Sequence, residues 1–549
     1  MLQGVNTWAS VVRICLFLAV VAIVPCLGPT ASAQPAPADA TRLSDVARTL
    51  GASPAEAADV ARVYRARAAA AIWTTAQGIP GEAAIAMTAR FEAAATHGLD
   101  PAAYRLPAVL DRAALAGDRL AARDVAFTLA TLRYMRHLHL GRVDPRRLGL
   151  RLQAWDEPHD FAAILADALA AGRVPAAVDA LAPPFAVYRA LMVALARYRA
   201  LAGEGLPPVP AVKVSVRAGD TWSGVAAVAR RLVVLGDLEA AAAPAPGATT
   251  YVEPLVSAVR RFQRRHGLAP DGTIGARTVA ALQVPVASRA DQIVLALERL
   301  RWLPDLGTRR VVAVNIPMFR LWAWEPGPLD QPPVRSMDVI VGRALRTETP
   351  VFVETLDHVI FRPYWNVPPS IVRDEVLPAI RRNPRYLNTQ QMEIVRGPGD
   401  DAVVVPATPE AVAALAAGTL RLRQRPGPHN ALGLVKFVFP NRESVYMHGT
   451  PSPSLFARDR RDFSHGCIRV ADPPALAAWT LSGVPGWTAA RISEAMQAAQ
   501  PERVPVAAPI DVVLFYMTAS VGPDDEALHF ADDIYGHDRA LARALAMPR

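Results

Sequence analysis

The residues best suited to chemistry are a histidine and a cysteine in two short glycine-containing motifs. His448 lies in the segment Tyr446–Thr450, and Cys467 ends the run Ser464–Cys467. A cysteine attacks a carbonyl carbon as the thiolate, and a nearby imidazole can take the thiol proton and return it to a leaving group. A strand ending at His448 and a tight turn ending at Cys467 would bring the two side chains together. The pattern therefore predicts a nucleophile and its general base.

Neighbouring groups in the same motifs suit the other needs of acyl transfer. The spacing places no particular Asp or Asn where it would orient the base. The carbonyl of Gly449 is the simplest candidate because it follows His448 directly. The N–H groups around Gly466 and Cys467 can point at a developing oxyanion. Tyr446 lies two residues before His448 on the same face of the predicted strand, so its hydroxyl can contribute as well.

The N-terminal residues 1–33 have the features of an export signal, with an apolar run from Ile14 to Val24 and small residues up to Ala33. We therefore expect a periplasmic protein. The alternative is an uncleaved membrane anchor, because Val11–Leu27 is near the shortest length that spans a bilayer. Two of the three cysteines lie within the signal, which leaves Cys467 as the only thiol of the mature chain. A lone thiol in an oxidising compartment is a candidate reactive group.

Zinc binding is the competing interpretation of the same motifs. His448, His465 and Cys467 are residue types that bind zinc, but the last two are only two positions apart. A closed zinc site would also need a fourth ligand, and the mature chain has no other cysteine to supply it. No phosphate-binding loop of the GxxxxGK[ST] kind is present either. We therefore predict no metal and no other cofactor.

Length and composition indicate several globular domains. A chain of 549 residues is too long for one core, and 52% hydrophobic against 20% charged residues is enough to bury apolar surface over most of its length. The formal charge is +9, yet Lys213 and Lys436 are the only lysines and the arginines are widely spread. Because no dense basic run alternates with aromatics, nucleic-acid binding is not expected. Weak attraction to an anionic envelope polymer is compatible with the charge.

The first part of the mature chain, residues 34–208, has the apolar spacing of a helical scaffold. Within it, Trp73 and Tyr104 are interpreted as core aromatics. His137 and His139 are two apart on a predicted helix and are interpreted as surface residues. The predicted amphipathic helices include Ala57–Ile72, Asp124–Leu140 and Phe185–Leu201.

Residues 209–287 follow a proline-rich break and form a second predicted domain. Its centre, Val256–Leu282, has the apolar spacing of two short helices joined by a glycine-containing turn. The Phe-Gln, Gly-Leu, Asp-Gly and Ile-Gly pairs in this stretch resemble the small helical peptidoglycan-binding module. A helical spacer that has lost its ligand is the alternative.

Residues 288–549 form a third, mainly β domain, so that the fold class is multidomain α+β. After a predicted helix at Arg289–Arg301 the apolar period changes to two, which is typical of strands. A helix-like insertion at 374–424 interrupts the strands and is expected to lie over the sheet as a cap. The final part, 501–549, contributes a C-terminal strand and tail. The predicted strands are Val311–Ile316, Phe319–Trp324, Met337–Val341, Val435–Phe439, Ser444–Met447 and Ile510–Ser520.

The two motifs together resemble the YkuD-type catalytic domain of L,D-transpeptidases, in which a His-Gly pair is followed by Ser-His-Gly-Cys and then Arg or Asn, here Arg469. The resemblance extends to Trp365–Ile371, to Asn383–Leu387 and to Asp532–Gly536. With the helical scaffold and the inserted module, the chain is similar to the large Gram-negative subgroup of this family.

The resemblance implies a two-step acyl transfer on peptidoglycan, whose stem peptides and glycan would be the partners. Cys467 would attack the third stem residue and release D-alanine, and a second stem would resolve the acyl-enzyme as a 3→3 cross-link. His448 would be the base and Gly449 its orienting carbonyl. The remaining site residues implied are Tyr446 and Gly466 for the oxyanion, with Ser464, His465, Arg469, Trp365 and Asn366 around the substrate.

The sequence leaves several alternatives open. An L,D-carboxypeptidase would use the same residues with water as acceptor, and a non-catalytic wall-binding scaffold would keep only the fold. Attachment of wall proteins and the oligomeric state are equally open. The length of the insertion 374–424 suggests a lid over Cys467 that excludes water from the acyl-enzyme.

Overall fold

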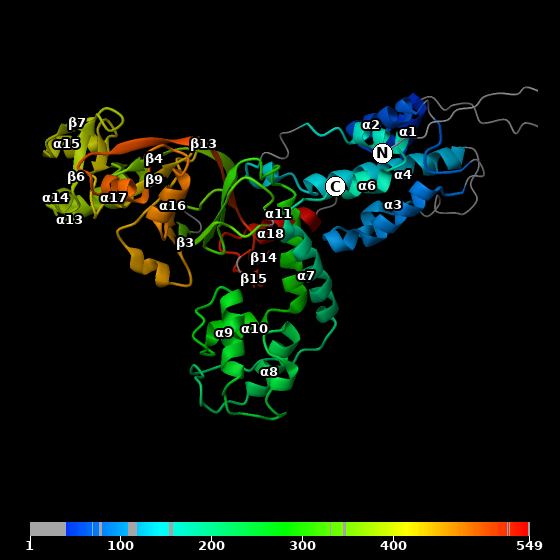
Figure 1. Ribbon diagram of the computed structural model, residues 1–549, viewed down its shortest axis with the longest axis horizontal. Coiled ribbons are helices and arrows are strands. Elements are labelled where there is room, and N and C mark those ends of the chain that lie inside the picture. Colours follow the sequence, from blue (N-terminus) through cyan, green and yellow to red (C-terminus); the bar gives the residue numbers. More distant parts are fainter. Residues whose placement is uncertain are drawn as a thin grey trace, which may run out of the picture.

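The computed structural model describes residues 40–67, 70–75, 79–107, 118–152, 158–329, 331–343, 347–523, 525 and 527–546. The predicted export signal, residues 1–33, lies outside these ranges. Within them, no helix is both long and apolar enough to cross a membrane. Figure 1 shows a helical bundle at one end, a β-rich part at the other, and a small helical module beside the junction between them.

The N-terminal part is helical, as predicted. Its core contains Trp73 and Tyr104, which are 2% and 1% exposed and confirm the prediction of core aromatics. His137 is a correction, because it is buried and its Nδ1 lies 2.8 Å from the Tyr104 hydroxyl. Its predicted place on the surface was wrong, since both faces of this long helix are covered. The helices are α1 (Ala40–Thr49), α2 (Pro54–Ala66), α3 (Glu82–Glu92), α4 (Asp118–Leu140), α5 (Phe161–Ala170) and α6 (Val174–Asp179).

The second domain contains α8 (Val225–Leu235), α9 (Leu255–Arg265) and α10 (Ala276–Gln283). The side chain of Gln263 joins α9 to the following loop, because its Nε2 donates to the Thr273 carbonyl at 2.9 Å and its Oε1 accepts from the N–H of Gly272 at 2.8 Å. Phe262 and Ile274 lie in the core. The Phe-Gln and Asp-Gly pairs of the sequence motif therefore close the loop between the helices.

Two long helices join the domains. Helix α7 (Ala186–Ala202) packs along α11 (Val286–Leu300), and the apolar cluster between them continues into the hairpin of β14 (Ala519–Val521) and β15 (Leu528–Phe530). Figure 1 shows this pair in the middle of the molecule. The β14–β15 hairpin, near the C-terminus, thus lies against the junction of the three domains.

The third domain is built on a nine-stranded sheet in the order β11-β3-β12-β10-β9-β4-β13-β1-β2. An additional pairing of β2 with β3 closes the sheet on itself. Its interior holds the largest apolar cluster, which helices α16 (Pro473–Thr480) and α17 (Ala489–Gln497) extend. The strands are β1 (Arg310–Asn315), β2 (Arg320–Trp324), β3 (Arg335–Gly342), β4 (Phe352–Phe361), β9 (Val435–Val438), β10 (Met447–His448), β11 (Asp462–Ser464), β12 (Ile468–Val470) and β13 (Glu502–Phe515).

The insertion forms a small unit with its own apolar cluster. Its helical character was predicted, and the helices are the run α12 (Pro369–Ile371), a π-helical turn (Val372–Val376) and α13 (Leu377–Arg382), and α15 (Pro409–Ala416). A four-stranded sheet in the order β5-β8-β6-β7 accompanies them and was not predicted. Figure 1 shows this unit at the outer end of the β-rich part. The remaining α-helices and strands are α14 (Tyr386–Thr389), α18 (His537–Ala546), β5 (Trp365–Asn366), β6 (Met392–Arg396), β7 (Val403–Val405) and β8 (Arg421–Gln424).

Several element bounds differ from the sequence prediction. Helix α2 ends at Ala66 instead of reaching Ile72. The strand before the first motif is limited to Met447–His448, because Ser444 has φ +56° and cannot continue a strand. The C-terminal strand predicted at Ile510–Ser520 does return to the main sheet, but as β13, and Ala519 already belongs to the separate hairpin.

Candidate active site

The two predicted motifs meet on one face of the main sheet. Strands β10 and β12 run parallel, with Met447 opposite Ile468 and His448 opposite Arg469. Met447 and Ile468 point into the apolar interior. Because side chains alternate along a strand, the flanking Tyr446, His448, Cys467 and Arg469 share the outer face. The phenol of Tyr446 lies beside the imidazole of His448, with ring centroids 5.7 Å apart.

His448 is buried and hydrogen-bonded to the backbone of Gly449 and of Leu432. Its Nδ1 donates to the carbonyl of Gly449 at 2.6 Å, which is the orienting contact expected from the sequence. That hydrogen bond leaves the lone pair of the neutral ring on Nε2. Burial and the charge of Arg469 lower the pKa of His448 to about 3, despite the opposing effect of the Gly449 carbonyl. The imidazole is therefore neutral at neutral pH and can accept a proton.

Cys467 is a partly exposed free thiol. Its Sγ lies 4.0 Å from the carbonyl oxygen of Ser444, toward which the thiol can donate. Burial raises the pKa of Cys467, and hydrogen bonds from the N–H and hydroxyl of Tyr446, with the charges of Lys436 and Arg469, offset part of that rise. The resting thiol is therefore protonated at neutral pH, so attack on a substrate requires a base.

Ser464 closes the turn that carries the thiol. Its buried hydroxyl donates to the carbonyl of Cys467 at 2.5 Å and accepts from the N–H of Gly466 at 3.2 Å. Gly466 has φ +102°, a left-handed conformation that favours glycine. The N–H of Gly466, expected at the oxyanion, is thus already engaged by Ser464. The candidates for that role are the N–H of Cys467 and the hydroxyl of Tyr446, which at rest donates to the sulfur of Cys467.

Two residues without a role in the sequence analysis support this turn. Thr349 donates through Oγ1 to the carbonyl of Gly466 at 2.8 Å. The hydroxyl of Tyr535 accepts from the N–H of Thr349 at 3.2 Å and donates to the carbonyl of Gly342 at 2.6 Å. Tyr535 belongs to the segment Asp532–Gly536, which the sequence analysis singled out only because it resembles the L,D-transpeptidase family. These hydrogen bonds show that Tyr535 supports the nucleophile turn through Thr349.

Arg469 presents a cation without a counterion. Its guanidinium forms no hydrogen bond or ion pair with the part of the chain that the structure describes, and its Nε is buried without a partner. Burial lowers the pKa of Arg469. An unpaired, partly buried guanidinium is costly unless a ligand compensates it. The expected role of Arg469 in holding a substrate carboxylate fits this environment.

Lys436 is a member of the site that sequence reasoning missed. It lies opposite His448 in the β9–β10 pairing, and its Nζ is 3.9 Å from the centroid of the Tyr446 ring. Burial lowers the pKa of Lys436, while Cys467 acts to raise it. The sequence feature that could have drawn attention to Lys436 is the rarity of lysine, since this chain contains only one other.

The insertion and strand β5, which pairs with β8 of the insertion, reach the site at two points. The side chain of Trp365 hydrogen-bonds to the hydroxyl of Tyr446. His465, next to the nucleophile turn, places Nε2 at 2.7 Å from Oε1 of Glu375 in the π-helical turn. A pocket of about 530 Å³ lies between the insertion and the sheet, and its lining includes Asn366, Tyr446 and Lys436. All predicted site residues thus lie at or next to one region.

Among the described residues, no three His, Cys, Asp or Glu side chains are grouped as a metal ion would require. His465 is already paired with Glu375.

Comparison with known proteins identifies three domain families in this order along the chain. Residues 58–195 match a scaffold domain, residues 223–282 match a "Putative peptidoglycan binding domain", and residues 309–490 match the L,D-transpeptidase catalytic domain, YkuD. The last region contains both motifs. Residues 309–490 therefore belong to the YkuD L,D-transpeptidase family, and the chain joins that catalytic domain to scaffold and peptidoglycan-binding domains.

A curated relative carries a matching name. A protein of Haemophilus influenzae, "Putative L,D-transpeptidase", is 30% identical over 279 residues, which are 50% of this chain and 54% of that protein. The chain thus spans about half the length of this relative. A solved structure of an L,D-transpeptidase from Xylanimonas cellulosilytica is 19% identical, covering 56% of this chain and all of that one, with a TM-score of 0.17.

Proposed function

We propose that this protein is a periplasmic L,D-transpeptidase that forms 3→3 peptidoglycan cross-links through an acyl-enzyme on Cys467. The observation that carries the proposal is the shared face of Tyr446, His448, Cys467 and Arg469, of which Tyr446 also lines a pocket of about 530 Å³. The matching catalytic domain supports action on peptidoglycan.

In the first step, Nε2 of His448 takes the proton of Cys467 as the sulfur forms a bond to the carbonyl carbon of the third stem residue. The N–H of Cys467 and the hydroxyl of Tyr446 stabilise the resulting oxyanion. The C–N bond to the terminal D-alanine then breaks, and His448 returns the proton to the leaving amine. Arg469 holds a substrate carboxylate, for which a planar guanidinium is well suited.

In the second step, the side-chain amine of another stem attacks the thioester. His448 accepts a proton from that amine, the C–S bond breaks, and the thiolate regains a proton as the cross-link forms. With water as the acceptor, the same steps would release a tripeptide, which is the reaction of an L,D-carboxypeptidase. The contacts of the insertion with Tyr446 and the Cys467 turn favour the amine, because a covered thioester is less open to water.

The test is mass spectrometry of the products formed from purified disaccharide-tetrapeptide. A cross-linked dimer with release of D-alanine is expected. Tripeptide alone would replace the proposal with the carboxypeptidase, and absence of any product would favour a non-catalytic wall-binding scaffold.

A further inference from the structure

Two cations flank the candidate base on the outer face of the main sheet. Lys436 of β9 lies opposite His448 of β10, and Arg469 of β12 lies opposite the same histidine from the other side. Side chains directly opposite each other on paired strands share one face of a sheet, and neighbouring strands lie about 4.8 Å apart. One positive charge therefore stands on each side of His448.

The ammonium of Lys436 lacks an anionic partner. Its Nζ forms no hydrogen bond or ion pair with any described residue, and it lies over the face of the Tyr446 ring, 3.9 Å from the centroid. Asp400 acts on Lys436 through its charge without forming an ion pair. Burial lowers the pKa of Lys436, because the charged form is incompletely compensated there. An anionic ligand would supply the missing partner.

The pocket that Lys436 faces has a positive lining. It holds about 530 Å³ between the insertion and the sheet, and none of its lining residues that the structure describes is acidic. Arg373 and Arg421 line it from the insertion, but Arg373 is paired with Asp374 at 2.7 Å and Arg421 is exposed. Lys436 is therefore the cation that an anion bound against the sheet would meet.

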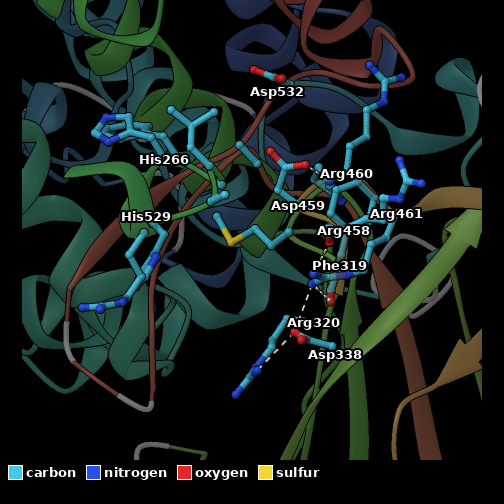
Figure 2. A pocket seen from close by; sticks show the side chains of 18 of the residues that line it. His266, Phe319, Arg320, Asp338, Arg458, Asp459, Arg460, Arg461, His529 and Asp532 are labelled. Carbon is cyan, nitrogen blue, oxygen red and sulfur yellow. Dashed lines mark hydrogen bonds and ion pairs between the residues drawn. The ribbon is translucent and has the colours of Figure 1, made fainter. Parts of the chain in front are cut away.

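The pocket at the domain junction has a different charge. It also holds about 530 Å³ and lies where the peptidoglycan-binding module meets the catalytic domain, with Arg264 on one wall and Arg458 on the other. Acidic side chains line it as well, and Asp338 pairs with Arg461 at 3.0 Å. Figure 2 shows Asp338 and Asp459 in the same group as Arg458–Arg461. Its cations are thus largely balanced within the protein, unlike Lys436.

The pocket beside Lys436 is continuous with the nucleophile. Ser444 and Tyr446 both line it. The carbonyl oxygen of Ser444 lies 4.0 Å from Sγ of Cys467, and the hydroxyl of Tyr446 donates to the same sulfur. The charge of Lys436 is near enough to lower the pKa of Cys467. A substrate whose reacting carbonyl lies at Cys467 can therefore extend past Tyr446 to this ammonium.

We infer that Lys436 binds the terminal carboxylate of the donor peptide and thereby determines which peptide bond Cys467 attacks. The inference rests on the proposed acyl transfer and adds the residue that selects the bond. In that reaction the carbon bearing the released amine also bears a free carboxylate. A longer peptide has an uncharged amide in the same place. Lys436 thus restricts attack to the last peptide bond, and Arg469 serves a carboxylate on the acyl side of that bond.

Two donors that differ in one terminal group test this role. The first is a tetrapeptide stem with a free terminal carboxylate, and the second is the same stem ending in D-alanine amide. The kcat/KM for release of the terminal residue should favour the acid by roughly tenfold to a hundredfold in the wild type, as expected for one charge-assisted contact. Lys436→Met should bring this ratio close to one, and Lys436→Arg should keep most of it. A stem extended by one residue should react like the amide.

The ratio separates carboxylate binding from the effect of Lys436 on the thiol. A change in the pKa of Cys467 alters the rates of both donors by the same factor and cancels in the ratio. Arg421→Gln is the matched control, because Arg421 lines the same pocket from the insertion. This variant should keep the wild-type ratio.

Equal kcat/KM for the acid and the amide in the wild type would overturn the inference, and this measurement does not depend on whether the variants fold. A preference for the acid that survives in Lys436→Met would overturn it as well, as would its loss in Arg421→Gln. If the wild type forms no product from either donor, the proposed acyl transfer itself fails.

Discussion

His465 Nε2 lies 2.7 Å from Oε1 of Glu375, so the turn that carries Cys467 touches the insertion directly. The imidazole is charged only when protonated, and both side chains are partly exposed, at 37% and 54%. Such a contact contributes little to stability, about 1 kcal/mol at most. It is placed, however, where it can hold the insertion closed over the thioester.

Glu375→Gln should therefore increase hydrolysis relative to cross-linking, by up to about fivefold, which corresponds to the loss of roughly 1 kcal/mol. The ratio of tripeptide to dimer from disaccharide-tetrapeptide measures this effect. Asp374→Asn is the matched control, since Asp374 pairs with Arg373 on the insertion itself. An unchanged ratio in Glu375→Gln would show that this contact does not hold a lid.

Cys467→Ala should abolish product formation and leave the fold intact, because the side chain is only partly buried and loses a single sulfur atom. The free energy of unfolding should change by no more than about 1 kcal/mol. Intact-protein mass spectrometry after carbapenem treatment should show one adduct on the wild type and none on the variant. Cys467→Ser keeps the volume and serves as the second check of folding. An adduct that persists in Cys467→Ala would assign the nucleophile elsewhere.

The pH dependence of alkylation tests the protonation states at rest. Burial raises the pKa of Cys467, and the pKa of His448 is about 3, so both the thiol and the imidazole are uncharged at neutral pH. Alkylation by iodoacetamide requires the thiolate, and its rate should rise about tenfold per pH unit from about pH 6, without a plateau below about pH 8.5, the pKa of free cysteine. A plateau already reached at neutral pH would instead indicate a preformed thiolate-imidazolium pair. Glutathione treated in parallel provides the reference.

Lys436→Met should shift that alkylation profile to higher pH, because the ammonium lowers the pKa of Cys467 through its charge. Alkylation at neutral pH should be several-fold slower. Lys436→Arg should keep most of the wild-type rate, since the positive charge is retained. Lys213→Met, at the only other lysine, is the control and should match the wild type. An unchanged profile in Lys436→Met would show that this charge does not act on the thiol.

The placement of the candidate site residues was easier to predict from the sequence than the sheet around them. The motifs specify Cys467, His448 and the Gly449 carbonyl by local spacing, and the structure brings these groups to one region. Strand β4, by contrast, was missed although it lies at the centre of the sheet. Its burial follows no simple alternation, and its pairing with β13 shifts register between Pro505 and Ile510.

Contacts that only the tertiary fold creates could not be predicted from the sequence either. Lys436 joins the site through the pairing of β9 with β10, and no local spacing relates it to Cys467. The same holds for Thr349 and Tyr535, which are 186 residues apart and meet behind the nucleophile turn. Arg264 and Arg458 face one pocket only because the module docks on the catalytic domain.

Tyr535→Phe tests whether support from the C-terminal segment reaches the nucleophile. Removing the hydroxyl leaves the carbonyl of Gly342 without its 2.6 Å donor and the N–H of Thr349 without its acceptor. Buried groups left unpaired cost about 1–3 kcal/mol, so the melting temperature should fall. Because Thr349 holds the carbonyl of Gly466, carbapenem acylation of Cys467 should also slow, measured well below the melting temperature. Thr349→Ser keeps the Oγ donor and should acylate at nearly the wild-type rate. If the Tyr535→Phe protein is less stable but is acylated at the wild-type rate, Tyr535 contributes to stability alone.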